Sequence, residues 1–215
     1  MKITDAGVCP FPNGDSSVRR LALEAAVLGF DSLVAIDTPV NATYGEVEVR
    51  AGLFIRNAGV KDVIVQVKRV KESGTVVSVK AGDAGFNRAA VGLRGVHILR
   101  GVHAADKNAF DHVTAKMAAD NRVAIDIDLS VLIAGRGIAR QRAIQRFRDV
   151  LVLENRFEFP LTFSTYARSV LELRAVREIS GLGSLLGMDI PDVERALAGV
   201  DAVTTIRQPS VKVLP

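Results

Sequence analysis

Short apolar runs alternate with amphipathic segments along the whole chain, and this alternation is the feature that most limits its fold. Several runs are rich in Val and Ile and apolar nearly throughout, which is typical of strands buried on both faces of a parallel sheet. The predicted strands are Lys2–Val8, Ser32–Ile36, Gly52–Ile55, Thr75–Lys80, Val96–Leu99, Val123–Leu129, Pro160–Phe163 and a late one at Val211–Leu214.

Helices are predicted between these strands from the spacing of apolar residues and from residues that begin or end helices. A helix over residues 18–28 has Ser16 or Ser17 as its cap and Gly29 as its stop. Residues 110–121 and 191–199 show similar signals. The β-branched segment 60–72 would also suit a strand, but a strand there would leave no crossover before residue 75. We therefore predict a helix over it.

About eight strands alternating with helices predict a single α/β domain over residues 1–215, a TIM-like (β/α) barrel of parallel strands with outer helices. An open, doubly wound sheet is the alternative. No G-x-G-x-x-G motif follows the first predicted strand, which removes the usual reason to prefer a dinucleotide-binding fold.

Composition excludes several kinds of site. The single cysteine, Cys9, excludes an internal disulfide and a cysteine-based zinc cluster, and three histidines leave few ligands for any metal. The net charge of +4 favours an anionic partner. The sequence contains no apolar tract of ~18 residues, the length needed to span a membrane. Its N-terminal segment has an acid where a signal peptide would be apolar. We therefore expect a cytoplasmic protein.

Two carboxylates alternate along the apolar segment 123–129. Period two places Asp126 and Asp128 on one side of this strand. If that side is the barrel interior, the two acids are a candidate metal or acid–base pair. Otherwise they form ion pairs with Lys or Arg, an alternative favoured because no histidine or third ligand is placed to help.

The most basic segment spans residues 135–148. As a helix, it would place Arg142 and Arg146 on the solvent side, opposite a buried stripe of apolar residues. Arg136 and Arg140 would lie at the helix start, near the end of the barrel where such folds place their sites. These arginines are either an ordinary solvated helix face or a ridge that binds RNA phosphates.

Further polar residues follow other predicted strands. Asn87 and Arg88 begin the helix after Thr75–Lys80, Ser164 closes the strand ending at Phe163, and Arg174 and Arg177 are expected in the next helix. Each alone is compatible with a structural role such as helix capping. Together they predict a polar, positively charged rim that binds RNA or a protein partner.

The chain resembles the archaeal ribonuclease P protein component 3 family, the thirty-kilodalton subunit family with a PHP- or TIM-like barrel. The resemblance is carried, in the family's order, by Asn87–Ala90, Phe110–Val113, Met117–Asn121, Val123–Leu129, Pro160–Ala167, Leu173–Arg177 and Leu186–Met188. It covers nearly the whole chain. The sequence departs from the family at Ala175-Val176, where a Ser-Pro pair is usual, and at His97, where Asp is usual.

The resemblance implies an RNA-binding subunit of ribonuclease P, in which the RNA, with magnesium, removes the 5′ leader of precursor tRNA. Its implied partners are the ribonuclease P RNA, precursor tRNA, the ferredoxin-like protein component 2 and the other protein subunits. PHP phosphoesterases, which share the fold, begin with a metal-binding D-x-H-x-H motif, whereas here the segment Asp5–Cys9 lacks both histidines. No cofactor, catalytic residue or metal site is therefore expected in this chain, and the isolated chain should be inactive.

Two alternative functions remain open at this point. One is a metal-dependent barrel phosphoesterase that uses Asp5, Asp126 and Asp128. The other is a metabolic barrel enzyme that binds a small phosphorylated ligand through Arg88 and Arg140. The first predicts bound divalent metal and phosphatase activity, and the second predicts binding of a small ligand without RNA.

Overall fold

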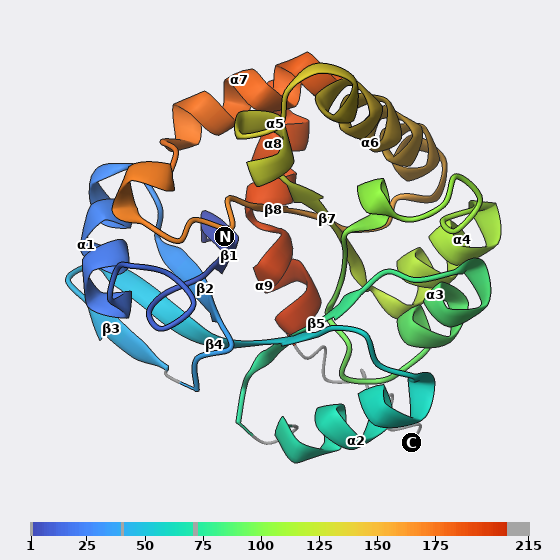
Figure 1. Cartoon of the computed structure of the whole chain (residues 1–215), viewed down its shortest axis with the longest axis horizontal. Coiled ribbons are helices and arrows are strands. Elements are labelled where there is room, and N and C mark those ends of the chain that lie inside the picture. The colour runs from blue at the N-terminus through green and yellow to red at the C-terminus, as the bar shows by residue number, and fades with distance from the viewer. Residues whose placement is uncertain (1, 40, 71–72, 206–215) are drawn as a thin grey trace, which may run out of the picture.

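The strands of the protein form a nearly closed barrel, as seen in a computed structural model that describes residues 2–39, 41–70 and 73–205 (Figure 1). The described strands are β1 (Thr4–Val8), β2 (Ser32–Ile36), β3 (Ala42–Tyr44), β4 (Val47–Ile55), β5 (Val76–Lys80), β6 (Ile98–Arg100), β7 (Ala124–Asp128) and β8 (Leu161–Ser164). They pair in the order β1-β2-β4-β5-β6-β7-β8, all in parallel, and β3 pairs antiparallel with β4. The prediction of a TIM-like barrel is confirmed.

The two ends of this sheet, β1 and β8, meet beyond the last residue of β8. Tyr166 N donates a hydrogen bond to Gly7 O, and Cys9 N donates to Ala167 O, each over 2.8 Å. These bonds bring the sheet edges together and account for the barrel shape. The predicted strand at Val211–Leu214 lies outside the described residues.

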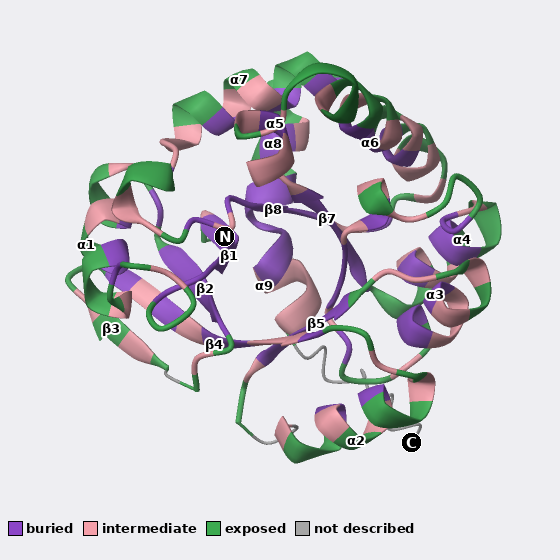
Figure 2. Cartoon of the chain, in the orientation of Figure 1, coloured by how far each residue is buried: buried purple, intermediate pink, exposed green. Residues whose placement is uncertain are grey.

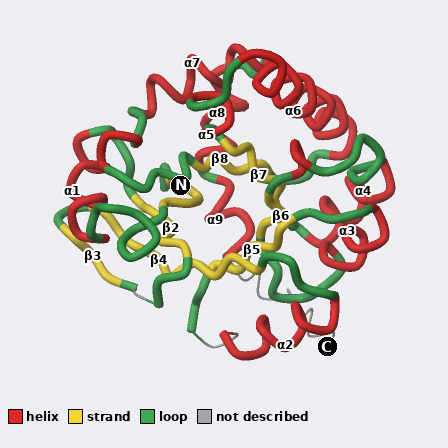
Figure 3. Tube along the Cα trace, in the orientation of Figure 1, coloured by secondary structure: helices red, strands yellow, loops and turns green. Residues whose placement is uncertain are grey.

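Most helices surround the strands as an outer ring, and Figure 3 distinguishes them by colour from the inner ring of strands, within which α9 is seen. The helices are α1 (Val18–Val27), α2 (Val60–Val70), α3 (Ala84–Val91), α4 (His112–Asn121), α5 (Ser130–Ile133), α6 (Gly137–Phe157), α7 (Val176–Leu186), α8 (Ile190–Leu197) and α9 (Gly199–Thr204), with single 3-10 turns η1 (Val102–Ala104) and η2 (Val170–Glu172). The helices predicted over 18–28, 60–72, 110–121 and 191–199 are all found, with Ser17 as the cap of α1. Among the described residues, no helix has the length and hydropathy needed to cross a membrane.

The hairpin β3–β4 is the main element that the sequence analysis missed. β4 begins at Val47, five residues before its predicted start at Gly52, and β3 precedes it across a turn at Gly45. In β4, Val47 and Val49 are buried whereas Glu48 is half-buried. This alternation of apolar and charged residues marks a strand with one face toward the core. Such a strand begins without a continuous apolar run, so its first half was not predicted.

Apolar side chains fill one end of the barrel interior, where α9 closes it. Ala6, Val34, Ile98 and Ala124 pack there against Val200 of α9. A side chain at Gly199 would lie 1.8 Å from Leu161 O, so only glycine lets α9 approach so closely. Figure 2 shows the strands as mostly buried and the outer faces of the helices as exposed. The other end, where the strands finish, is called here the mouth of the barrel.

Candidate functional site

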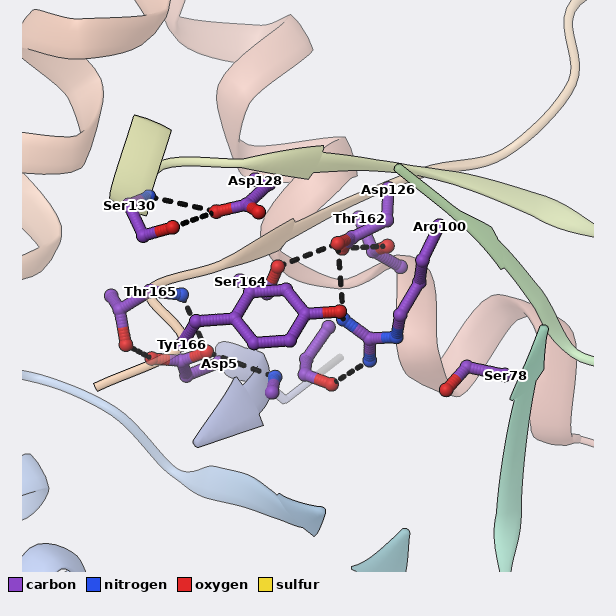
Figure 4. A network of polar contacts seen from close by, with 12 residues as sticks. Asp5, Ser78, Arg100, Asp126, Asp128, Ser130, Thr162, Ser164, Thr165 and Tyr166 are labelled. Carbon is purple, nitrogen blue, oxygen red and sulfur yellow. Dashed lines mark hydrogen bonds and ion pairs between the residues drawn. The ribbon is translucent and has the colours of Figure 1, made fainter. Parts of the chain in front are cut away.

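The barrel interior near the mouth holds a buried ion pair. Arg100, the last residue of β6, places Nη1 3.0 Å from Oδ2 of Asp126 in β7, and both side chains are almost completely inaccessible to solvent. Figure 4 shows Arg100 reaching across the barrel toward β1 and β8. Desolvating two such charges costs free energy unless further hydrogen bonds satisfy them.

The Arg100 guanidinium has two further partners. Its Nη2 donates to Ala6 O, and its Nη1 lies 3.3 Å from the Tyr166 hydroxyl. A Cβ at Gly7 would lie 2.9 Å from Nη1, so this glycine makes room for the guanidinium beside β1. Burial alone would lower the pKa of Arg100, but Asp126, Tyr166 and Asp128 together outweigh burial and raise this pKa, so the side chain remains charged.

Both carboxylate oxygens of Asp126 accept hydrogen bonds from neighbouring side chains. Its Oδ1 accepts a hydrogen bond from Thr162 Oγ1 (2.9 Å), and its Oδ2 accepts one from Ser164 Oγ (2.6 Å) besides the one from Arg100. Both alternatives raised from the sequence therefore hold in part: the Asp126 side of β7 faces the interior, and Asp126 forms an ion pair with an arginine.

Two aromatic rings lie beside the guanidinium. The carbon Cζ of Arg100 lies 5.3 Å from the ring centre of Tyr166 and 5.8 Å from that of Phe54, distances typical of cation–π contacts. Burial raises the pKa of Tyr166, which keeps its phenol protonated. Tyr166 has a φ of 52°, an uncommon conformation for a bulky residue, and this turns the chain just after β8.

Two more carboxylates border this network. Asp5 accepts hydrogen bonds from Gly7 N (3.0 Å), Thr165 N (3.1 Å) and Thr165 Oγ1 (2.5 Å), and so joins β1 to the segment after β8. Asp128 accepts hydrogen bonds from Ser130 N (2.9 Å) and Oγ (2.5 Å). Burial raises the pKa of each aspartate from 3.8 to about 6, although the hydrogen bonds act in the opposite direction.

The raised pKa of Asp128 predicts a pH-dependent contribution to stability. Between pH 4 and 6 the folded protein holds this proton more readily than the unfolded chain, so the contribution is largest at low pH and declines as the pH rises through about 6. Asp128→Asn removes it. The difference in the free energy of unfolding, variant minus unmodified protein, should therefore be about 1 kcal/mol larger at pH 8 than at pH 5.

Urea unfolding of both proteins at both pH values measures this difference. Subtracting the unmodified protein cancels the contributions of His97 and His103, whose pKa values are lowered by burial and which act in the opposite direction. An effect of Asp128→Asn that is the same at pH 5 and pH 8 would contradict the prediction.

The arrangement does not suit a metal ion. Both oxygens of Asp126 are already used, Asp5 is held by Thr165 and Gly7, and the Arg100 cation lies against Asp126. Within residues 2–39, 41–70 and 73–205, no three His, Cys, Asp or Glu side chains are grouped so that they could hold a metal. A phosphoesterase that uses Asp5, Asp126 and Asp128 is therefore disfavoured by the geometry.

Two residues predicted on the rim prove to be internal. Asn87 is completely buried, and its side-chain amide bonds to Gly82 N, Gly82 O and Ala109 O. Ser164 is buried in the barrel and bonds to Asp126. Their polar atoms already have partners inside the protein, so contact with RNA or a protein partner would require these hydrogen bonds to break.

Three of the predicted arginines are tethered to nearby groups. Arg88 forms an ion pair with Asp111, whose pKa falls to about 2 because hydrogen bonds from Thr114 and Arg88 outweigh partial burial. Arg174 lies just before α7, not in it as predicted, and donates to two backbone carbonyls. Arg146 is half-buried and lies 3.4 Å from Ala105 O, so its predicted solvent position is wrong. The cause is the turn η1, which packs against α6.

The remaining predicted arginines lie where the sequence analysis expected them. Arg136 and Arg142 are exposed at the start of α6, Arg177 is exposed in the first turn of α7, and Arg140 is half-buried. Because α6 and α7 follow β7 and β8, these side chains belong to the mouth end of the barrel.

The sequence analysis missed Arg56 and Arg168, which follow β4 and β8 at the same end. Arg56 stacks on Phe54, with Cζ 4.1 Å from the ring centre, and pairs with Asp37 at 2.7 Å. Arg168 is exposed. Each is a single arginine after a predicted strand, a signal that the sequence carried but that is common in loops.

Comparisons with known proteins agree with this description. The model of the family described as RNase P subunit p30 matches residues 2–205. Ribonuclease P protein component 3 of Methanothermobacter thermautotrophicus is 29% identical over 203 residues, which cover 87% of this chain and 82% of that protein. The corresponding protein of Haloarcula marismortui is 32% identical over 197 residues, covering 86% and 83%.

Among solved structures, a chain in the cryo-EM structure of archaeal ribonuclease P with mature tRNA has the same fold, with a TM-score of 0.74 and 20% identity. The match covers 94% of this chain and 89% of that chain. The family match spans almost all of the described barrel, including the segments that supply Asp5, Arg100, Asp126 and Tyr166. The chain belongs to the RNase P subunit p30 family.

Proposed function

We propose that this chain is a non-catalytic, RNA-binding protein subunit of ribonuclease P, which supports the catalytic RNA in removing the 5′ leader from precursor tRNA. The observation that carries the proposal is the family match over residues 2–205. The barrel interior supports it, because an arginine and its hydrogen-bond partners occupy the place where a barrel hydrolase would hold a metal or substrate. The chemistry is then left to the RNA and to magnesium bound with it, and this chain binds no cofactor.

The exposed arginines at the mouth end supply the RNA contacts in this proposal. Arg136, Arg142 and Arg177 project into solvent, and no ion pair ties them to another described residue. Arginine binds phosphate oxygens through several N–H donors at once. Added positive charge also offsets repulsion between phosphates and so favours a compact RNA. Arg88, Arg140, Arg146 and Arg174 are half-buried and contribute mainly by shaping this surface.

The proposed partners follow from membership of the family. They are the ribonuclease P RNA, precursor tRNA, the ferredoxin-like protein component 2 and the other protein subunits of the particle. In this proposal the ribonucleoprotein works in the cytoplasm.

Reconstituted cleavage of precursor tRNA tests the proposal. We expect no cleavage by the chain alone, and we expect the RNA with the other subunits to reach half-maximal cleavage at a lower magnesium concentration once the chain is added. The Asp128→Asn variant is the control for hidden catalysis, because Asp128 is the least buried of the three interior acids. Hydrolysis by the pure chain that disappeared in this variant, or an unchanged magnesium requirement, would overturn the proposal.

A further inference from the structure

A groove of about 530 Å³ lies at the end of the barrel opposite the mouth. Its walls are the second half of α6, the start of β8, and the helices α8 and α9, which can be followed in Figure 1. Its apolar lining includes Leu151, Phe159, Pro160, Leu161, Met188 and Ala196. We call it the α6–α8 groove. An apolar groove of this size is of the kind that receives side chains of a partner.

Acidic side chains also line the groove. Glu154, Glu158 and Asp192 contribute three carboxylates, against a single cation, Arg195. Arg195 already forms an ion pair with Asp192 in the same helix. Glu154 and Glu158 therefore give the groove a net negative charge within a chain whose formal net charge is +4.

Glu154 is the most informative of these residues. It is half-buried in the groove wall, and among the described residues no side chain lies within ion-pair distance of its carboxylate. Burial raises its pKa, and the neighbouring Asp192 and Glu158 add to this effect, while Arg195 acts against it. A cation brought in by a partner would offset both effects, because it stabilises the ionised carboxylate.

Exposed apolar side chains lie close in sequence to residues that line the groove. Val152 is 68% exposed and follows the lining residue Leu151, and Ile190 is 66% exposed two residues after Met188. Leu185 is also exposed, on the neighbouring end of α7, where Arg148 of α6 binds its carbonyl. Val152 and Ile190 therefore add exposed apolar surface to α6 and α8, the two helices that form walls of the groove.

From this complementarity we propose that the α6–α8 groove docks a segment of another protein that carries Lys or Arg side chains beside an apolar anchor. The anchor would contact Leu151 and Met188, and the cations would pair with Glu154 and Glu158. RNA is disfavoured here, because its phosphates would meet two uncompensated carboxylates. The proposal goes beyond RNA binding at the mouth, and it assigns the two ends of the barrel to different classes of partner.

Charge reversal in the groove tests this directly. The probe is a fluorescent peptide of alternating Lys and Leu, with a Glu–Leu peptide of equal length as the negative control. We expect the Lys–Leu peptide to bind the full chain and to lose at least about 10-fold in affinity in Glu154→Lys/Glu158→Lys, because two attractive contacts become repulsive. The double variant Glu46→Lys/Glu194→Lys is the matched control, since it changes the charge equally at exposed positions outside the groove.

A second arm uses the other protein subunits of ribonuclease P in the absence of RNA. Hydrogen exchange of the full chain should slow at residues 151–158 and 187–196 when the docking subunit is added, and charge reversal should abolish this protection. If no subunit bound, the proposed function in ribonuclease P would be in question. The peptide experiment would still show whether the groove docks a basic, apolar segment.

Three results would overturn the docking proposal. The first is equal peptide affinity in the groove variant and in its matched control. The second is displacement of the bound peptide by RNA in the Arg136, Arg142 and Arg177 triple variant, which would place RNA in the groove. The third is a change in oligomeric state on charge reversal, measured by analytical ultracentrifugation, because the occupant would then be a second copy of this chain.

Discussion

Arg100→Met should lower the free energy of unfolding by about 3–5 kcal/mol, the largest loss that we expect from any single substitution at the polar centre of the barrel. The substitution removes the cation and leaves the Asp126 carboxylate buried with only the Thr162 and Ser164 hydroxyls as partners. It also frees the carbonyl of Ala6, which accepts from Arg100 Nη2. Urea unfolding at pH 7, followed by circular dichroism, measures the effect.

Two variants show whether the loss comes from the unpaired charge. Arg100→Met/Asp126→Leu removes both partners and should recover much of the lost stability, because no isolated charge then stays buried. Arg142→Met removes an exposed arginine and should change stability by less than about 0.5 kcal/mol. A cost of under about 1 kcal/mol for Arg100→Met would show that water or local rearrangement compensates for the charge. The barrel centre would then be far less dependent on this ion pair than the structure indicates.

The barrel could be predicted from the sequence because its strands are buried on both faces. A run such as Ser32–Ile36 is apolar almost throughout, and it is buried at every position in the structure. Such a run needs only local sequence to be detected. The hairpin β3–β4 was not predicted for the opposite reason: Val47–Arg50 is buried on one face only and contains no continuous apolar run.

The polar centre of the barrel could be predicted only in part. Period two correctly placed Asp126 and Asp128 on the same side of β7, because side-chain direction along a strand is a local property. Their cation was not predictable in the same way. Arg100 comes 26 residues earlier, at the end of a strand predicted to finish at Leu99, and only the pairing of β6 with β7 brings it to Asp126.

The same division holds on the outer helices. The spacing along α6 predicted that Phe147 is buried and Arg142 is exposed, and both are so. It could not predict that Arg146 is half-buried, because the turn η1 that covers it comes from residues 102–104. Helix periodicity describes one helix at a time, and a charge on the edge of its buried face depends on what the rest of the fold places there.

The second large effect concerns RNA affinity, which we expect to depend on the exposed arginines at the mouth end. Replacing Arg136, Arg142 and Arg177 together with glutamine should weaken binding to ribonuclease P RNA on the order of 100-fold at low salt. The slope of log affinity against log salt should flatten by roughly three, about one for each lost phosphate contact. Since all three side chains are exposed, stability should change by less than about 1 kcal/mol in total. Fluorescence anisotropy across a salt titration, with a melting curve for each protein, measures both quantities.

The matched control removes three exposed arginines from the opposite end of the barrel. Arg69, Arg94 and Arg156 lie near the ends of helices that lead back to the amino ends of the strands, so their replacement by glutamine gives the same change in net charge. If binding depends on the mouth end, this control should keep most of its affinity and most of its salt slope. Equal losses in the two triple variants would show that RNA responds only to the net charge of the chain. The mouth end would then not be a specific RNA-binding surface, and the assignment of Arg136, Arg142 and Arg177 to RNA contacts would be wrong.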